Sequence, residues 1–199
     1  AIAACRKGVE LNPDNPDAYV NFLLTLNYSP ACGAPTFLKE HRRFGARFAR
    51  PFVEPPLDRT WPRRLRVGYV SPDFRKHAVA QFAEPILANH DRERFEIFCY
   101  YNQRHVDEST RRFRELADHW LDCVHFSDND LAERIRADGI DLLVDLAGHT
   151  NGQRLRVFAA KAAPVQLSYL GYPNTTGRAA IDYRLSDDRA DPPAEADPW

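Results

Sequence analysis

The fold is decided by the stretch Leu65-Arg66-Val67-Gly68-Tyr69-Val70-Ser71-Pro72-Asp73-Phe74, which continues to Lys76-His77. A short apolar run ends in this stretch at Ser71 and Pro72, a pattern typical of a β-strand that opens into a loop. The loop carries Asp73 and His77, two side chains that can take part in chemistry. Because open α/β sheets bind ligands at the carboxyl ends of parallel strands, the stretch predicts an α/β domain with a candidate site at this loop.

The chain after residue 64 continues to alternate strand-like and helix-like runs. We expect further strands near 95–101, 123–126, 140–146, 165–170 and 181–185, and helices near 79–90, 109–117, 128–137 and 154–161. Asp128 or Asp130 is expected to cap the third of these helices. This alternation predicts a mostly parallel, doubly wound sheet with helices on both faces.

The first 63 residues have a different, all-α pattern. Residues 1–28 predict two helices with a turn between them, in which Asp14 or Asn15 caps the second helix. The pair resembles a junction between tetratricopeptide repeats, and a plain helical hairpin is the alternative. Residues 29–63 predict a linker helix and then a proline-rich linker, and residues 64–199 form the α/β domain.

Composition limits the class of protein. The chain has 199 residues, of which 44% are hydrophobic and 12% aromatic, as in globular proteins. A net charge of −1 gives no reason to expect nucleic acid or a membrane surface as a partner, and no apolar run approaches the ~20 residues of a membrane span. The four cysteines form no Cys-x-x-Cys pair, so we expect free thiols and a cytoplasmic location. The chain has no methionine, and we expect it to be a piece of a longer protein.

The first candidate site is the loop with Asp73 and His77. Histidine changes its charge near neutral pH and therefore suits proton transfer, or contact with phosphate and sugar groups. A purely structural role for His77 is the alternative. The Gly-x-Gly-x-x-Gly fingerprint of dinucleotide binding is absent after this strand, which argues against a dehydrogenase.

A second polar loop, Gly148-His149-Thr150-Asn151-Gly152, lies between a predicted strand and a predicted helix. Its glycines permit close approach of the backbone, and amides at the start of a helix attract anions. This makes His149 a candidate substrate-binding residue. An ordinary turn with His149 at the surface explains the same residues, because Gly and Asn are common in turns.

The third polar loop, residues 171–177, follows another predicted strand. Gly171 frames a tight turn, and Tyr172, Thr175 and Thr176 offer hydroxyl groups beside an aromatic ring. A sugar is recognised by such short polar groups next to an aromatic surface. The cluster of hydroxyls favours a binding function over a bare turn.

Other enzyme classes fit less well. The histidines and cysteines have no zinc-ligand spacing, so no metal site is predicted, and no Gly-x-Ser-x-Gly motif occurs. Asp141 and Asp145 share one predicted strand and are expected to be strand-end residues rather than a glycosidase pair.

The combined motifs resemble the catalytic region of the protein O-linked N-acetylglucosamine transferases and their SPINDLY relatives. The matching pieces are Arg66-Val67-Gly68-Tyr69-Val70-Ser71 with Asp73-Phe74 and His77, residues 95–100 and 140–148, Ala163-Pro164-Val165-Gln166, Leu170-Gly171-Tyr172-Pro173 with Thr175 and Gly177, and Asp182-Tyr183. The resemblance implies the Rossmann-like first lobe of a GT-B glycosyltransferase, preceded by the end of a tetratricopeptide-repeat region. The second lobe of that fold would be missing from this chain.

The resemblance also implies a reaction and roles for residues. A sugar would move from a nucleotide diphosphate to a Ser or Thr hydroxyl of an acceptor protein, with inversion and without a metal or cofactor. His77 would be catalytic, near the donor sugar, and Tyr172, Pro173 and Thr175 would face that sugar. UDP-N-acetylglucosamine is the first candidate donor, and GDP-fucose, used by plant SPINDLY proteins, is the alternative. A non-catalytic repeat scaffold that binds proteins is the alternative from another class, and we expect these 199 residues alone to be inactive.

Overall fold

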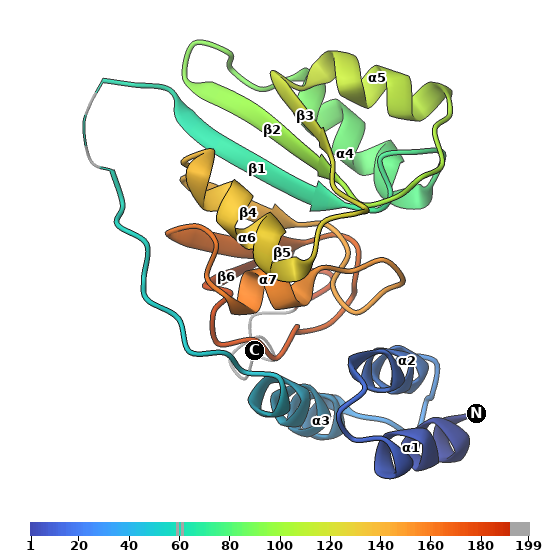
Figure 1. The fold of residues 1–199 in the computed structure, drawn as a ribbon. Helices are drawn as coiled ribbons and strands as arrows, with labels where there is room; N and C mark the ends of the chain where they lie inside the picture. The colour runs from blue at the N-terminus through green and yellow to red at the C-terminus, as the bar shows by residue number, and fades with distance from the viewer. Residues whose placement is uncertain (59, 61, 192–199) are drawn as a thin grey trace.

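The computed structural model describes residues 1–58, 60 and 62–191 (Figure 1). Residues 192–199, which close the predicted domain 64–199, lie outside the described residues. In the described part, a segment of three helices precedes an α/β unit, and an extended segment joins the two (Figure 1). None of the helices described there combines the length and the hydropathy that crossing a membrane requires.

The α/β unit is built on one six-stranded sheet with the order β3-β2-β1-β4-β5-β6 (Figure 1). The strands are β1 (Leu65–Ser71), β2 (Phe95–Tyr101), β3 (His119–Asp122), β4 (Leu142–Asp145), β5 (Val165–Tyr169) and β6 (Tyr183–Leu185). Every pairing between them is parallel, and Val67 of β1 lies opposite both Ile97 and Leu142. The prediction of a parallel α/β sheet is therefore confirmed.

Helices cover both faces of the sheet. The helices are α1 (Ile2–Leu11), α2 (Pro16–Leu26), α3 (Ala34–Arg47), α4 (Ala78–Ala88), α5 (Glu108–Leu116), α6 (Asp128–Ala137) and α7 (Leu155–Ala159). Along β1, Val67 and Tyr69 pack in one apolar cluster with α4 and α5, while Val70 packs in another with α6 and α7. Because strand side chains alternate between faces, two helices on each side form the doubly wound arrangement.

Two local predictions are wrong. The strand expected at 123–126 lies instead at His119–Asp122, and Cys123 accepts a turn hydrogen bond from the Phe126 amide at 3.0 Å. An edge strand with exposed polar ends has no apolar run to reveal it. Neither expected aspartate caps α6, because the Ser127 hydroxyl accepts the amide of Asp130. Serine is among the best N-cap residues, and the aspartates occupy the first turn, where the helix dipole favours them.

The helical segment has its own core. Val9 of α1, Leu23 and Leu26 of α2 and Phe44 of α3 are buried together. Asn15 caps α2, as one of the two expected residues, by accepting the Asp17 amide at 2.9 Å. The two-helix pattern of residues 1–28 is therefore confirmed, and α3 completes the cluster.

This segment is docked on the loop after β5 through a close backbone contact. A Cβ at Gly45 of α3 would lie 1.7 Å from the carbonyl oxygen of Gly177, and a Cβ at Gly177 would lie 2.1 Å from that of His41. Only residues without a side chain allow helix and loop to approach this closely. Nearby, the Tyr172 hydroxyl is bonded to Nε2 of His41 and to Nδ2 of Asn27, both at 2.8 Å.

Two buried histidines complete this interface. The ring of His149 packs against Phe44, His41 and Tyr172, with centroid separations of 4.7, 5.2 and 5.2 Å. His149 and His41 are both fully buried. Burial lowers the pKa of His41 to about 4 and lowers that of His149 well below its ordinary value, so both rings are neutral at neutral pH.

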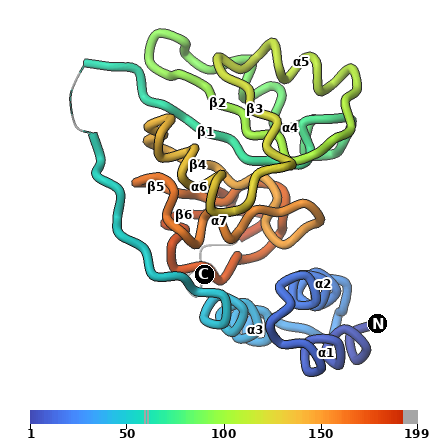
Figure 2. The backbone as a smooth tube through the Cα atoms, in the orientation of Figure 1, coloured from blue at the N-terminus to red at the C-terminus, as the bar shows by residue number. Residues whose placement is uncertain are grey.

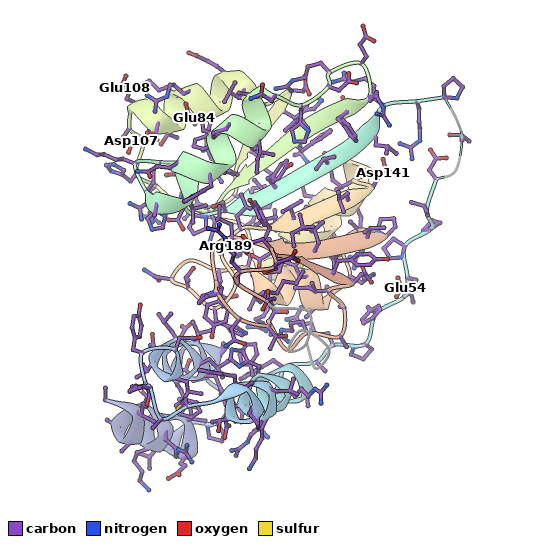
Figure 3. All side chains as sticks on the ribbon, turned by 180° about the vertical axis from the view of Figure 1, so that it is seen from behind. Glu54, Glu84, Asp107, Glu108, Asp141 and Arg189 are labelled. Atoms are coloured by element: carbon purple, nitrogen blue, oxygen red, sulfur yellow. The ribbon has the colours of Figure 1, made fainter. Side chains whose placement is uncertain are left out.

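The linker passes the amino ends of the strands (Figure 2). Its described residues contain no helix or strand, as the proline-rich sequence predicts. It encloses a cavity of about 760 Å³ against the starts of β1 and β4. At this edge Arg63 forms an ion pair of 2.6 Å with Asp141. Figure 3 shows Asp141 on the same side of the molecule as Glu54 of the linker. The cavity is therefore at the end of the sheet opposite to the predicted site.

Substitution of Gly45 by alanine tests the docking of α3. Alanine favours helices over glycine, yet Gly45→Ala should lower the free energy of unfolding by about 1–3 kcal/mol because its methyl group overlaps the Gly177 carbonyl. The matched control is Gly8→Ala in α1, where no atom lies within 4 Å of the added methyl group. That variant should gain about 0.5–1 kcal/mol. Urea denaturation measures both, and a gain at both positions would contradict the close contact.

The histidine interface predicts a loss of stability in acid. The unfolded chain protonates histidine near pH 6.5, whereas folded His41 resists protonation to about pH 4. Stability should therefore be complete above pH 6.5 and fall below it, by about 1.4 kcal/mol per pH unit for each such histidine. His41→Gln should make the decline shallower, and His125→Gln, at an exposed position, should not. Unfolding free energies measured from neutral to mildly acidic pH check this, and equal values across that range would exclude it.

Candidate active site

At the carboxyl edge of the sheet, the strand order reverses between β1 and β4. From β1 the connections lead outward to β2 and β3, and from β4 they lead the other way to β5 and β6. The loops that leave β1 and β4 therefore diverge, which opens the position where doubly wound sheets bind ligands. Asp73 and His77 belong to the first of these loops, and His149 belongs to the second.

Hydrogen bonds within the loop and from the N-cap of α5 hold the loop after β1 in its conformation. The Ser71 hydroxyl accepts the amide of Asp73 at 2.9 Å, and the carboxylate of Asp107 accepts the amide of Lys76 at 2.8 Å. Asp107 also caps α5 by accepting the Thr110 amide, and these amides lower its pKa to about 2. The loop conformation is therefore tied to the start of a neighbouring helix.

Asp73 and His77 face each other within this loop. The carboxylate of Asp73 is buried, 3.6 Å from Nδ1 of His77 and 3.2 Å from Nη2 of Arg75. Burial raises the pKa of Asp73, and the neighbouring His77 and Arg75 oppose that rise. The side chain of His77 is 38% exposed. A buried carboxylate thus lies beside an imidazole that a ligand can reach.

His77 is also the N-cap of α4. Its Nδ1 accepts the amide of Val79 at 3.2 Å. An accepting nitrogen carries no proton, so the neutral ring has its proton on Nε2. In this arrangement the outward nitrogen of His77 is a hydrogen-bond donor.

The loop after β4 is organised by a buried aspartate. Asp145 accepts the amides of Ala147 and Gly148 at 3.0 and 2.9 Å, and burial raises its pKa to about 6. Asp141 and Asp145 lie at opposite ends of the strand, where each shapes the backbone, and they do not face a shared space. The expectation that they are strand-end residues rather than a glycosidase pair agrees with these contacts.

The loop after β5 lies directly on the loop after β4. A Cβ at Gly171 would lie 1.9 Å from the carbonyl oxygen of Leu146, and a Cβ at Gly148 would lie 2.2 Å from Cβ of Tyr172. Leu170 has φ of 70°, a left-handed conformation that is strained for leucine. The third loop therefore reaches its position at an energetic cost, which the surrounding contacts offset.

The structure divides the predicted binding residues into two groups. His149, Tyr172 and Thr176 are buried against the helical segment or the loop itself, and Nε2 of His149 donates to the Thr176 carbonyl at 2.8 Å. Pro173 is exposed, while Gly171 and Thr175 are half-buried. Among the described residues, no hydrogen bond or ion pair joins either group to Asp73 or His77.

Some residues that hold the site were not singled out from the sequence. Asn102 follows β2 and donates to the Gly152 carbonyl at 2.7 Å, while Nη2 of Arg154 donates to its Oδ1 at the same distance. The position of Asn102 directly after a predicted strand was the feature of the sequence that could have pointed to it. Asn27 and His41, which bind Tyr172, gave no such signal because their partner is more than a hundred residues away.

The described residues contain no group of three or more His, Cys, Asp or Glu side chains that could hold a metal ion. The charged groups of the first loop can accept or donate hydrogen bonds to a sugar or phosphate oxygen. The arrangement therefore suits binding and proton-linked chemistry on a polar ligand.

Comparison with known proteins identifies relatives over nearly the whole chain. The rice protein described as a probable UDP-N-acetylglucosamine–peptide N-acetylglucosaminyltransferase SPINDLY is 36% identical over 96% of this chain, which covers 22% of that protein. The Caenorhabditis elegans UDP-N-acetylglucosamine–peptide N-acetylglucosaminyltransferase is 39% identical over 63% of this chain and 11% of its own length. The chain thus spans about a fifth or less of these relatives.

A solved structure has the same fold. A mutant of the O-GlcNAc transferase of Thermobaculum terrenum superposes with a TM-score of 0.94 at 38% identity, over 99% of this chain and 38% of that one. The sequence profile of glycosyl transferase family 41 matches residues 49–199, which include all six strands. From these matches and the shared fold, the chain belongs to glycosyl transferase family 41.

Proposed function

We propose that the protein containing this chain transfers N-acetylglucosamine from UDP-N-acetylglucosamine to Ser or Thr hydroxyls of acceptor proteins. The observation that carries the proposal is the accessible imidazole of His77 beside the buried carboxylate of Asp73, at the point where the loops after β1 and β4 diverge. The names of the relatives from rice and Caenorhabditis elegans supply the donor and the peptide acceptor.

In this proposal His77 donates a hydrogen bond from Nε2 to an oxygen of the donor substrate. This role agrees with the helix cap, because Nδ1 accepts the Val79 amide only while it carries no proton. Action as a general base would require a proton on Nδ1, and the nearby carboxylate of Asp73 could hold it once the cap bond is given up. Asp73 is therefore proposed to set the orientation and the charge of the ring.

The third loop is proposed to face the sugar through its accessible members, Gly171, Pro173 and Thr175. His149, Tyr172 and Thr176 are buried, so we assign them the role of keeping that loop in its position. Positioning of the donor by rigid loops is a major source of rate enhancement in group transfer. The burial pattern supports this division of the residues predicted to bind substrate.

The remaining features of the reaction are also proposals. Inversion at the anomeric carbon and independence from metals and cofactors rest on the family resemblance. A second lobe would complete the cleft and stabilise the departing diphosphate. The four cysteines are free thiols, which supports a reducing compartment such as the cytoplasm.

SPINDLY-like transfer of fucose from GDP-fucose is the second candidate. The names of the six SPINDLY proteins that match over 92–96% of this chain give UDP-N-acetylglucosamine as the donor, so the fucose candidate rests on the resemblance of residues 171–177 to SPINDLY.

Two substitutions at one position test the role of His77. His77→Ala should abolish sugar transfer by the full-length protein and also remove the cap of α4, which costs about 1 kcal/mol. His77→Asn is the matched variant, since asparagine caps helices well but lacks the imidazole. It should keep the stability and still lose transfer. Mass spectrometry of an acceptor peptide and thermal unfolding give both readouts, and full transfer by His77→Asn would assign His77 a structural role only.

The donor is identified by direct assay. We expect full-length protein with UDP-N-acetylglucosamine to add an N-acetylhexosamine to acceptor peptides, and the 199-residue chain alone to add nothing, because it spans only 38% of the matched O-GlcNAc transferase. GDP-fucose is tested in parallel, and a deoxyhexose adduct would select the SPINDLY-like reaction. Intact-mass spectrometry distinguishes the two adducts. The absence of both would contradict the proposed transfer and favour a protein-binding scaffold.

A further inference from the structure

Asn102, the first residue after β2, is bonded to two loops of the candidate active site. Its backbone amide donates to the carbonyl oxygen of Ser71 at 3.0 Å, where the first loop begins. Its side-chain nitrogen Nδ2 donates to the carbonyl oxygen of Gly152 at 2.7 Å, where the second loop ends. A residue that belongs to neither loop therefore joins the loop that carries Asp73 and His77 to the loop after β4.

Arg154 fixes the orientation of the Asn102 side chain. Nη2 of Arg154 donates to Oδ1 of Asn102 at 2.7 Å and to the Cys123 carbonyl at 3.0 Å. Nη1 of the same guanidinium donates to Oδ1 of Asp128 at 3.0 Å, and the arginine side chain is only 12% exposed. Because a guanidinium can only donate hydrogen bonds, the oxygen of the Asn102 amide faces Arg154 and its nitrogen faces the second loop.

The first and second loops also touch each other, at Pro72 and Gly152. Gly152 has φ of 78°, and a Cβ at this position would lie 2.8 Å from Cβ of Pro72. Pro72 directly precedes Asp73, whose amide donates to the Ser71 hydroxyl at 2.9 Å. A displacement of Gly152 would therefore reach the first loop one residue before Asp73.

We propose that Asn102 is a positioning residue for the sugar transfer. Its side chain fixes the second loop relative to Asp73 and His77, so that a donor sugar between the loops meets the imidazole in the reacting orientation. Asn102 acts through the backbone of the two loops and not by contact with the substrate. This role rests on the proposed function and adds to it a residue from outside the three polar loops. Misplacement of a bound group by about 1 Å can lower the rate of a group transfer about a hundredfold.

Asn102→Asp tests this role, because aspartate has the same shape but its carboxylate only accepts hydrogen bonds. The variant keeps the bond from Arg154 and loses the bond to the Gly152 carbonyl. In the full-length protein with UDP-N-acetylglucosamine and an acceptor peptide, kcat per folded molecule should fall at least about tenfold, while KM for the donor changes less than about threefold. The control is Asn89→Asp, which removes a similar bond, from Nδ2 of Asn89 to the Pro85 carbonyl at the end of α4. It should leave kcat unchanged.

Circular dichroism at the assay temperature gives the folded fraction of each variant. If Asn102→Asp does not fold, Asn102→Ala, which removes both side-chain bonds without adding a charge, should lower kcat in the same way. A wild-type kcat in the folded variant overturns the positioning role alone, and so does a raised KM for the donor with kcat unchanged. Absence of transfer by the wild-type protein overturns the proposed function and the positioning role with it.

Hydrogen exchange adds a readout that needs no transfer. The backbone amides of residues 148–154 should exchange faster in Asn102→Asp than in the wild-type protein, because the loop has lost its bond to the end of β2. Exchange in this segment should be unchanged in Asn89→Asp. Equal exchange in the wild-type protein and Asn102→Asp would overturn the coupling of the two loops through Asn102, whether or not sugar is transferred.

Discussion

The arrangement of the described chain depends on the hydrogen bonds of the Tyr172 hydroxyl. Nδ2 of Asn27 donates to it, and it donates to Nε2 of His41, whose Nδ1 donates in turn to the Phe37 carbonyl at 2.6 Å. Each group in this relay has the partner that its chemistry requires, and the relay is largely shielded from water. Hydrogen bonds in such an environment are strong, and a broken one leaves a costly unpaired group.

This relay makes the helical segment part of the site's scaffold. Asn27 also accepts from Asn174 at 3.2 Å, so the end of α2 is bonded to the third loop at two places. The third loop in turn lies on the second through Gly171 and Gly148. Displacement of the helices would therefore move both loops at the carboxyl edge of the sheet.

The two ends of the sheet are electrostatically different. At the amino edge, Arg63, Arg64 and Arg66, which line the 760 Å³ cavity, are each paired with a carboxylate. At the carboxyl edge, Asp73 is buried beside an exposed imidazole, and amides rather than cations hold Asp145. A ligand at the carboxyl edge would meet the accessible imidazole of His77, which agrees with the position of sites in doubly wound sheets.

The candidate site was predictable only in part. Asp73 and His77 could be located because they follow an obvious strand, whereas the burial of His149 and Tyr172 had no local signal. An aromatic hydroxyl in a polar loop has the same pattern whether it meets a sugar or a helix. Arg178 gave no signal either, since its contacts with the Phe44 ring and the Phe48 carbonyl join it to a segment more than a hundred positions away.

The sequence by itself determined the parallel α/β sheet, the helical pair before it and the position of the first loop. Those features depend on periodicity and turn residues, which act over a few neighbouring positions. Only the tertiary structure decided that His119–Asp122 is the edge strand and that the third loop is hydrogen-bonded to the helices. The physical reason is separation along the chain: Asn27 and Tyr172 are 145 positions apart, and only the packed fold brings them into contact.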